Sequence, residues 1–193
     1  MKTITVTATA ILGAMLVLCS IALAQAQPQT KEEKKTISQV LDSSIKNVEN
    51  DFIPAAEAMP EEKYGFAPTN GDFKGVRTFA EQIKHVAASN YLIGAHILGE
   101  KSPVDANDGK GPDSLKSKTD ILKYLKDSFA YAHKAVASIT DANALEPIST
   151  SDGKSKTTRL GVALIFSWHG FDHYGQMVEY LRMNGIVPPA SRQ

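Results

Sequence analysis

Residues 158–185 read TRLGVALIFSWHGFDHYGQMVEYLRMNG, and this stretch predicts a long helix from about Thr158 to Asn184. Gly185 is a natural stop for the helix, and the prolines that follow it cannot continue one. His169 and His173 lie four residues apart, so a helix places both imidazoles on one face, one turn apart. This spacing suits two ligands of one metal ion, but a mononuclear centre needs a third ligand from another element.

Three segments upstream also carry apolar residues at helical steps of three and four. Pro54 does not fit cleanly inside the first segment, so we expect a kink or a late turn there. The second segment starts with Thr78 as N-cap and Glu81 three residues later, which is the capping-box pattern, and Gly99 is its stop. The three predicted helices cover residues 34–60, 78–98 and 118–139.

Polar segments rich in turn-forming residues join the four predicted helices. They cover residues 61–75, 101–114 and 140–157. The first carries three aromatic residues, Tyr64, Phe66 and Phe73, which we expect to pack back onto the body of the protein. Because no segment shows a convincing strand alternation, the sequence predicts an all-α four-helix bundle. The loops are long for a simple up-and-down bundle, so the packing order of the helices stays open.

The N-terminus predicts a secretory signal peptide. Lys2 precedes an apolar run over residues 11–23, and Ala22-Leu23-Ala24 fits a cleavage site before Gln25. A second candidate cut lies before Gln27. The alternative is an anchor that is never cut, but the run is short for a membrane span and polar residues follow it at once.

These boundaries divide the chain into four parts. We assign residues 1–24 to the signal peptide, 25–33 to a flexible leader, 34–187 to the helical domain and 188–193 to a tail. We therefore expect an exported protein, periplasmic or secreted from the cell, with no stable membrane span after cleavage.

The composition argues against several classes of function. Hydrophobic residues make up 42% and charged residues 22% of the chain, which is ordinary for a globular protein. A formal net charge of zero provides no bulk attraction for nucleic acid, so we expect no nucleic-acid partner. Cys19 lies in the signal peptide, so the mature chain has no thiol ligand, nucleophile or disulfide. Phosphate-loop, serine-hydrolase and His-Glu-x-x-His motifs are missing from the sequence.

Three further histidines could supply the third ligand. His85 is the best candidate, because core-type residues flank it on the second predicted helix. His96 lies eleven residues later, nearly on the same face but about 16 Å along the axis, so it cannot easily share a metal with His85. We interpret His96 and His133 as structural or surface residues. On the residues alone, packed core histidines remain an open alternative to a metal site.

The chain resembles the DinB-like superfamily of bacterial four-helix-bundle proteins from about residue 34 to 187. The pattern is a histidine on the second helix, here His85, and His-x-x-x-His followed closely by Gly-Gln on the last. His169, His173 and Gly175-Gln176 fit that last-helix motif, whereas Tyr174 stands where arginine is frequent. The resemblance implies that His85, His169 and His173 bind a divalent metal ion and leave a fourth position open. Three imidazoles do not distinguish zinc, nickel and iron.

The resemblance also implies a metal-dependent enzyme of hydrolase or thiol-transferase type that acts on a small molecule. Export weakens the transferase interpretation, because low-molecular-weight thiols are mainly cytoplasmic. The alternatives are a non-catalytic module that binds a metal or a small ligand, and a helical protein that forms a homodimer through its bundle. No catalytic acid or base is identified. Four polar residues are candidates for supporting roles around the site: Asn90, Asp172, Gln176 and Glu179.

Overall fold

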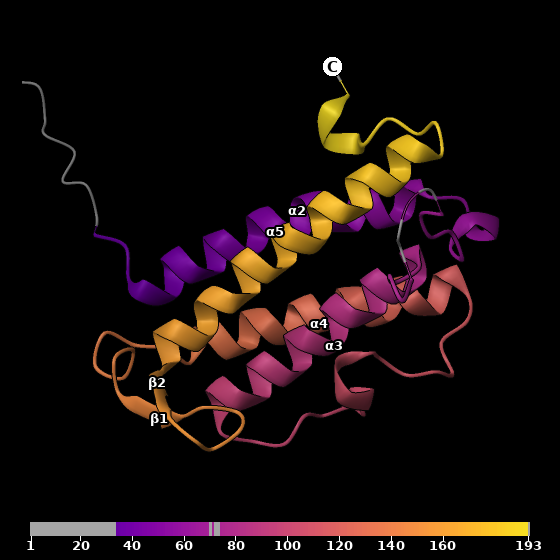
Figure 1. The fold of residues 1–193 in the computed structure, drawn as a ribbon. Coiled ribbons are helices and arrows are strands. Elements are labelled where there is room, and N and C mark those ends of the chain that lie inside the picture. The colour runs from indigo at the N-terminus through magenta and orange to yellow at the C-terminus, as the bar shows by residue number, and fades with distance from the viewer. Residues whose placement is uncertain (1–33, 70, 72–73, 193) are drawn as a thin grey trace, which may run out of the picture. The chain divides into compact units, whose positions relative to one another are not determined.

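The computed structural model describes residues 34–69, 71 and 74–192 (Figure 1). The expected signal peptide and the leader lie outside these described residues. Four long helices account for most of the rest: α2 (Ile37–Ala58), α3 (Phe79–Leu98), α4 (Lys118–Ala137) and α5 (Arg159–Met183). The prediction of an all-α four-helix bundle is confirmed. Within the described part of the chain, no helix combines the length and apolar character needed to cross a membrane.

Local capping signals set the helix ends. Thr36 and Thr78 each form a capping box with the residue three positions later, and Gly99 ends α3 in the left-handed region at φ 69°. Pro54 lies inside α2, which continues to Ala58, close to the predicted end at residue 60. Fully buried Phe52 and Ala55 pack into the core on either side of Pro54, and this tertiary packing holds the helical path.

Short elements lie in the connecting segments. Three 3-10 turns cover Glu61–Lys63 (η1), Asn107–Gly109 (η2) and Pro189–Ser191 (η3). The expectation of no strands was wrong in one place, where β1 (Pro147–Ser149) pairs antiparallel with β2 (Lys156–Thr158). Strands of three residues are too short for an alternating pattern to show in the sequence.

The helices pack in an order that differs from their order along the chain. α2 packs mainly against α4 and α5, and α3 also packs against α4 and α5. Consecutive helices α2 and α3 therefore lie diagonally across the bundle, as do α4 and α5. This arrangement accounts for the long first and third loops, because each must cross from one corner of the bundle to the opposite one.

The second loop is long for a different reason. Asn90 donates a hydrogen bond to Ser128, and Gly94 contacts Tyr131, so residue numbers rise together along α3 and α4 and the two helices are parallel. A segment that connects two parallel neighbouring helices must run back along the full length of a 20-residue helix, about 30 Å. Figure 1 shows residues 99–117 running back alongside α3 to the start of α4.

The aromatic residues of the first loop pack back onto the bundle as expected. Tyr64 donates a 2.8 Å hydrogen bond to the carbonyl oxygen of Ala56, and its ring meets Phe79 edge-on. Phe66 makes a similar edge contact with Tyr180. Phe73, the third aromatic residue, lies outside the described residues. These contacts attach the first loop to α2, α3 and α5.

Candidate metal centre

Three histidines from two helices meet between α3 and α5. His85 lies on α3, and His169 and His173 lie one turn apart on α5. Each offers one ring nitrogen, and these three atoms all lie within 4.8 Å of one another. The Nε2 atoms of His85 and His169 are 3.1 Å apart. The structure therefore brings together the three residues that the sequence analysis singled out.

A loop carbonyl defines the protonation of His85. The Nδ1 atom of His85 lies 2.5 Å from the carbonyl oxygen of Gly109, which can only accept a hydrogen bond. Nδ1 therefore carries the proton of the neutral ring, and Nε2 presents its lone pair to the other two histidines. This contact exists because the returning second loop passes across α3 at this point.

The loop near His85 has an unusual backbone. Asn107, Asp108 and Gly109 have φ values of 46°, 49° and 81°, three successive residues in the left-handed region. Local hydrogen bonds support this path: the amide group of Asn107 donates to the carbonyl oxygen of Gly111 at 3.1 Å. Nζ of Lys84 donates to the carbonyl oxygen of Pro112 at 3.2 Å, which attaches the loop to α3.

A chain of side-chain hydrogen bonds defines the protonation of His173. The carboxylate of Asp172 can only accept, so it orients the amide of Gln176, which donates to it at 3.1 Å. The oxygen of Gln176 then accepts from the amide nitrogen of Gln82 at 2.8 Å. The oxygen of Gln82 is left to accept from Nδ1 of His173 at 2.6 Å. Nε2 of His173 therefore also carries a lone pair toward the cluster.

Burial keeps the three histidines neutral. Desolvation, together with repulsion from neighbouring histidines, lowers the pKa of His169 and of His173 to about 4. Desolvation also lowers the pKa of His85, and the nearby guanidinium of Arg77 lowers the pKa of all three. At neutral pH the rings are uncharged, which is the form that binds metal ions.

The donor set and its spacing fit a divalent ion. Two imidazole nitrogens that share a tetrahedral zinc ion, each at about 2.0–2.1 Å from it, lie about 3.3 Å apart. The 3.1 Å separation of Nε2 in His85 and His169 is close to that value. Each of His85 and His173 also donates its other ring N–H to an oxygen, as metal-bound histidines usually do. These residues could hold a metal ion.

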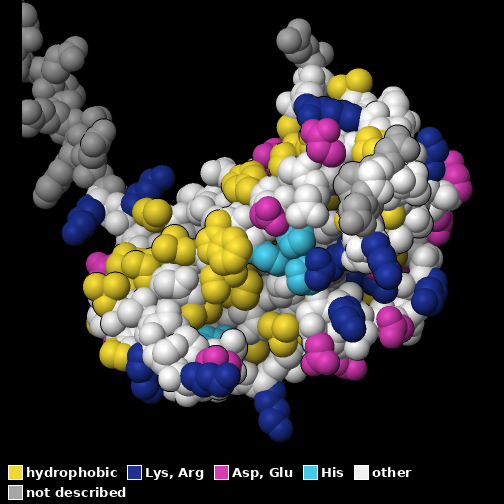
Figure 2. Space-filling view, in the orientation of Figure 1, with side chains coloured by type: hydrophobic (Ala, Val, Ile, Leu, Met, Phe, Trp, Pro, Cys, Tyr) yellow, Lys and Arg dark blue, Asp and Glu magenta, His cyan; other side chains and the backbone are white. Residues whose placement is uncertain are grey.

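The group is open on one side. His173 is buried, whereas His85 and His169 are only partly buried. Figure 2 shows histidine side chains at the surface, with hydrophobic side chains on one side of them and basic side chains on the other. No fourth ligand-type side chain joins the three histidines among the described residues. Three protein ligands with an accessible face are typical of catalytic rather than structural metal sites.

The other residues considered from sequence have mixed outcomes. Gln176 and Asp172 belong to the hydrogen-bond chain behind His173. Asn90 does not line the site, because it faces Ser128 between α3 and α4. Glu179 pairs with Arg182. Two further histidines lie apart from the group: His133 binds Asp42, while His96 lines a cavity further along α3.

Sequence reasoning missed two residues of the site. Gln82 precedes His85 by three residues and therefore shares its side of α3, so helical spacing could have revealed it. Gly109 contributes a backbone carbonyl from a loop, and no residue pattern identifies such a group. Both act on the imidazoles through the nitrogen that faces away from the cluster.

The fold and the cluster define a four-helix-bundle protein with a group of three histidines that could hold a metal ion. A family model described as the DinB superfamily matches residues 44–177. The chain belongs to this superfamily. A comparison with curated proteins returned no match.

Solved structures of bacterial proteins share the fold. A DinB-like protein from Bacillus cereus has a TM-score of 0.62 at 15% identity, covering 81% of this chain and 98% of its own. A conserved protein from Enterococcus faecalis has a TM-score of 0.63 at 13% identity, covering 78% and 98%. YfiT from Bacillus subtilis, with a TM-score of 0.57 at 18% identity, covers 83% and 94% and is described as "a probable metal-dependent hydrolase with an unusual four-helix bundle topology".

Proposed function

We propose that this protein is an exported metal-dependent enzyme, of hydrolase or thiol-transferase type, that acts on a small molecule at His85, His169 and His173. The observation that carries the proposal is the fixed tautomer of two of these histidines, whose Nε2 lone pairs converge on one accessible point. The description of the similarly folded YfiT as a metal-dependent hydrolase favours hydrolysis.

The residues of the site have distinct tasks in this proposal. His85, His169 and His173 would hold a divalent cation, which supplies Lewis acidity that polarises a carbonyl group or a water molecule. Gln82 and the carbonyl of Gly109 keep protons on the outer nitrogens of their histidines, so that the inner nitrogens stay free to bind. The partly exposed face of the cluster would admit the substrate.

The first test is the metal content of protein purified without a histidine tag, measured by elemental mass spectrometry. The proposal expects about one equivalent of a divalent metal in the wild type and almost none in His169→Ala or His173→Ala. His133→Ala is the matched control, because this histidine binds Asp42 away from the cluster, and it should keep the metal. A wild type that binds no metal and gains no thermal stability from zinc or nickel would contradict the proposal.

A second test separates catalysis from binding alone. Metal-loaded protein is assayed against a panel of small esters, amides and thiol acceptors, with His173→Ala in parallel. Turnover that requires both the metal and His173 supports an enzyme. Bound metal without turnover of any of these compounds favours a non-catalytic binding module.

Export is a separate part of the proposal and rests on the N-terminal sequence alone. Expression of the full chain in a bacterial host, followed by N-terminal sequencing of the recovered protein, tests it. Cleavage should leave Gln25 or Gln27 as the first residue. A protein that keeps Met1 and stays in the cytoplasm would contradict export and leave the proposed metal site untouched.

A further inference from the structure

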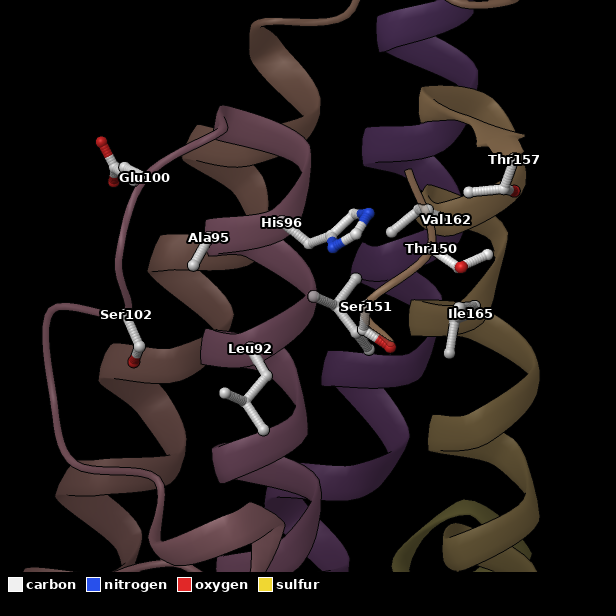
Figure 3. A pocket seen from close by; sticks show the side chains of 11 residues that line it. Leu92, Ala95, His96, Glu100, Ser102, Thr150, Ser151, Thr157, Val162 and Ile165 are labelled. Carbon is white, nitrogen blue, oxygen red and sulfur yellow. The ribbon is translucent and has the colours of Figure 1, made fainter. Parts of the chain in front are cut away.

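A cavity of about 530 Å³ lies between α3, α5 and the tip of the β1–β2 hairpin. It is separate from the three histidines but opens between the same two helices. Figure 3 shows His96 of α3 and Val162 of α5 pointing toward the space between the helices, while Glu100 points away from it. Its size falls within the range typical of small-molecule sites, about 300–1,000 Å³.

The cavity and the histidine cluster lie along one groove. On α3, His85, Leu92 and His96 follow one another at steps of seven and four residues, which places them on the same face. On α5, His169, Ile165 and Val162 are related by steps of four and three. Gln82 pairs with Gln176, and His85 lies against His169, so α3 and α5 run in opposite directions. The two rows therefore face each other.

The spacing along these rows gives the distance that a ligand must span between the histidines and the cavity. Ile165 precedes His169 by four residues, about 6 Å along the helix, and Leu92 follows His85 by seven residues, about 10 Å. Leu92 lines the cavity. A Cβ atom placed on Gly109 would lie 3.9 Å from Nδ1 of His85 and 4.0 Å from Cδ1 of Leu92. Leu92 therefore bridges the metal-site loop and the cavity.

The lining favours an apolar occupant. Five of the lining residues present aliphatic side chains: Leu92, Ile93, Ala95, Val162 and Ile165. The one acidic residue of the lining, Glu100, already accepts a hydrogen bond from Tyr131 at 2.7 Å and pairs with Lys134 at 3.5 Å. Glu100 therefore offers no free carboxylate to a cation. The other polar residues of the lining, His96, Ser102, Thr150, Ser151 and Thr157, supply a ring and hydroxyl groups beside the aliphatic surface.

Exposed apolar side chains continue the same surface toward the histidines. Leu92 is 42% exposed and Trp168 is 61% exposed, so both present apolar surface to solvent on this side of α3 and α5. The ring centroid of Trp168 lies 5.9 Å from that of His169. In Figure 2 hydrophobic side chains gather beside the exposed histidines.

We infer that this cavity holds the apolar tail of the substrate whose polar group reacts at the three histidines. The inference rests on the proposed function and adds a substrate class to it. The substrate is a small amphipathic molecule, with a hydrolysable or metal-binding head and an uncharged aliphatic or aryl tail that extends about 6–10 Å from the head.

The test uses alkyl hydroxamic acids with tails of increasing length, from acetohydroxamic to octanohydroxamic acid, because their heads chelate divalent metals. Dissociation constants are measured by calorimetry on zinc-loaded protein whose metal content is checked first. Each methylene that enters an apolar site should tighten binding up to about fourfold. We expect at least a tenfold gain between the acetyl and hexanoyl compounds.

Substitutions in the cavity test whether the alkyl tail of the hydroxamic acid binds there. Ile165→Trp and Leu92→Trp fill the cavity and should abolish the gain with chain length while the metal content stays unchanged. Leu164→Trp is the matched control, because this neighbouring residue is 50% exposed and does not line the cavity. It should keep the gain.

The outcomes separate the two proposals. If metal-loaded wild type binds all chain lengths equally, or if Ile165→Trp and Leu92→Trp keep the gain, the cavity does not receive the tail and the metal centre stands. The same conclusion follows if the wild type self-associates through this face and its dissociation constants do not change with chain length. A wild type that takes up no metal overturns the proposed function, and the cavity's link to it falls as well.

Discussion

The carbonyl oxygen of Gly109 lies 2.5 Å from Nδ1 of His85, so a loop backbone determines which nitrogen of a helix residue is free. The contact depends on topology, since α3 and α4 are parallel and their connection must pass back along α3. The backbone of the loop is unusual at this point, with three successive left-handed residues. Strain of this kind persists where the surrounding structure holds it, and it often marks functional sites.

Replacing Gly109 with alanine should weaken metal binding. The glycine has φ 81°, where an L side chain costs about 1–2 kcal/mol, and relief of that strain moves the carbonyl away from His85. We expect a loss of about tenfold in zinc affinity, measured by competition with a chromophoric chelator. Gly75→Ala is the control, because Gly75 has the same φ of 81° and a Cβ atom added there would meet nothing within 4 Å. Equal losses in both variants would disprove a specific role for Gly109.

Replacing Gln82 with leucine should weaken both metal binding and stability. The change leaves the buried Nδ1 of His173 without a partner, which costs about 1–3 kcal/mol, and also removes the donor to the half-buried oxygen of Gln176. Zinc affinity should fall by about 10- to 100-fold, as for other residues that orient metal-bound histidines. Both quantities are measured by chelator competition and by urea denaturation of the metal-free protein.

The control for Gln82 is Asn90→Ala on the same helix. Asn90 is 3% exposed and Gln82 is 1% exposed, and Asn90 donates to Ser128 away from the cluster. Its loss should lower stability without changing zinc affinity. If the two variants reduce zinc affinity to the same degree, the effect is one of general stability and the orienting role assigned to Gln82 is wrong.

Different parts of this structure were predictable to different degrees. The ends of α3 follow from Thr78, Glu81 and Gly99, which are local signals, and the pairing of His169 with His173 follows from helical spacing alone. His85 was the best third candidate from its flanking residues, but only the family resemblance joined it to His169 and His173, because the packing of α3 against α5 is a long-range property. The role of Gly109 was beyond reach, since it depends on the path of a loop around a bundle whose packing order stayed open.

The same distinction applies to β1 and β2. Three-residue strands are held by pairing across a turn, as between Ile148 and Thr157, and not by a pattern along the chain. Pro54 shows the converse, because proline is unfavourable inside a helix, yet the apolar pattern around it predicts a helix that continues, and the buried neighbours Phe52 and Ala55 hold it.

Metal-free protein should lose stability as the pH falls from about 6.5 to about 4. Desolvation lowers the pKa of His173 to about 4 in the folded protein, whereas the ordinary value of 6.5 applies after unfolding. Between these values the unfolded chain binds a proton that the folded chain does not, so the free energy of unfolding decreases as the pH is lowered. His169 contributes in the same direction through its lowered pKa of about 4.

Urea denaturation in the presence of a chelator, from pH 7.5 to 4.5, measures this dependence. Carboxylates also titrate at the acid end, so the informative quantity is the difference between wild type and His173→Gln. The variant should show a shallower decline below pH 6.5. Asn90→Ala, which removes a buried polar side chain that does not titrate, should decline in parallel with the wild type. A difference that does not change with pH would show that His173 keeps an ordinary pKa in the folded protein.

Gly170 and Gly175 on α5 should respond in opposite directions to alanine. A Cβ atom on Gly170 would lie 2.5 Å from Cγ1 of Val48, which is buried on α2, so Gly170→Ala forces the helices apart and costs about 1–3 kcal/mol. A Cβ on Gly175 meets nothing within 4 Å, so Gly175→Ala should raise the free energy of unfolding by about 0.5–1 kcal/mol through helix propensity. Urea denaturation measures both, and Val48→Ala combined with Gly170→Ala should recover part of the loss, because it removes the methyl group responsible. Strictly additive effects of the two changes would show that the close approach of α5 to α2 at Gly170 does not limit stability.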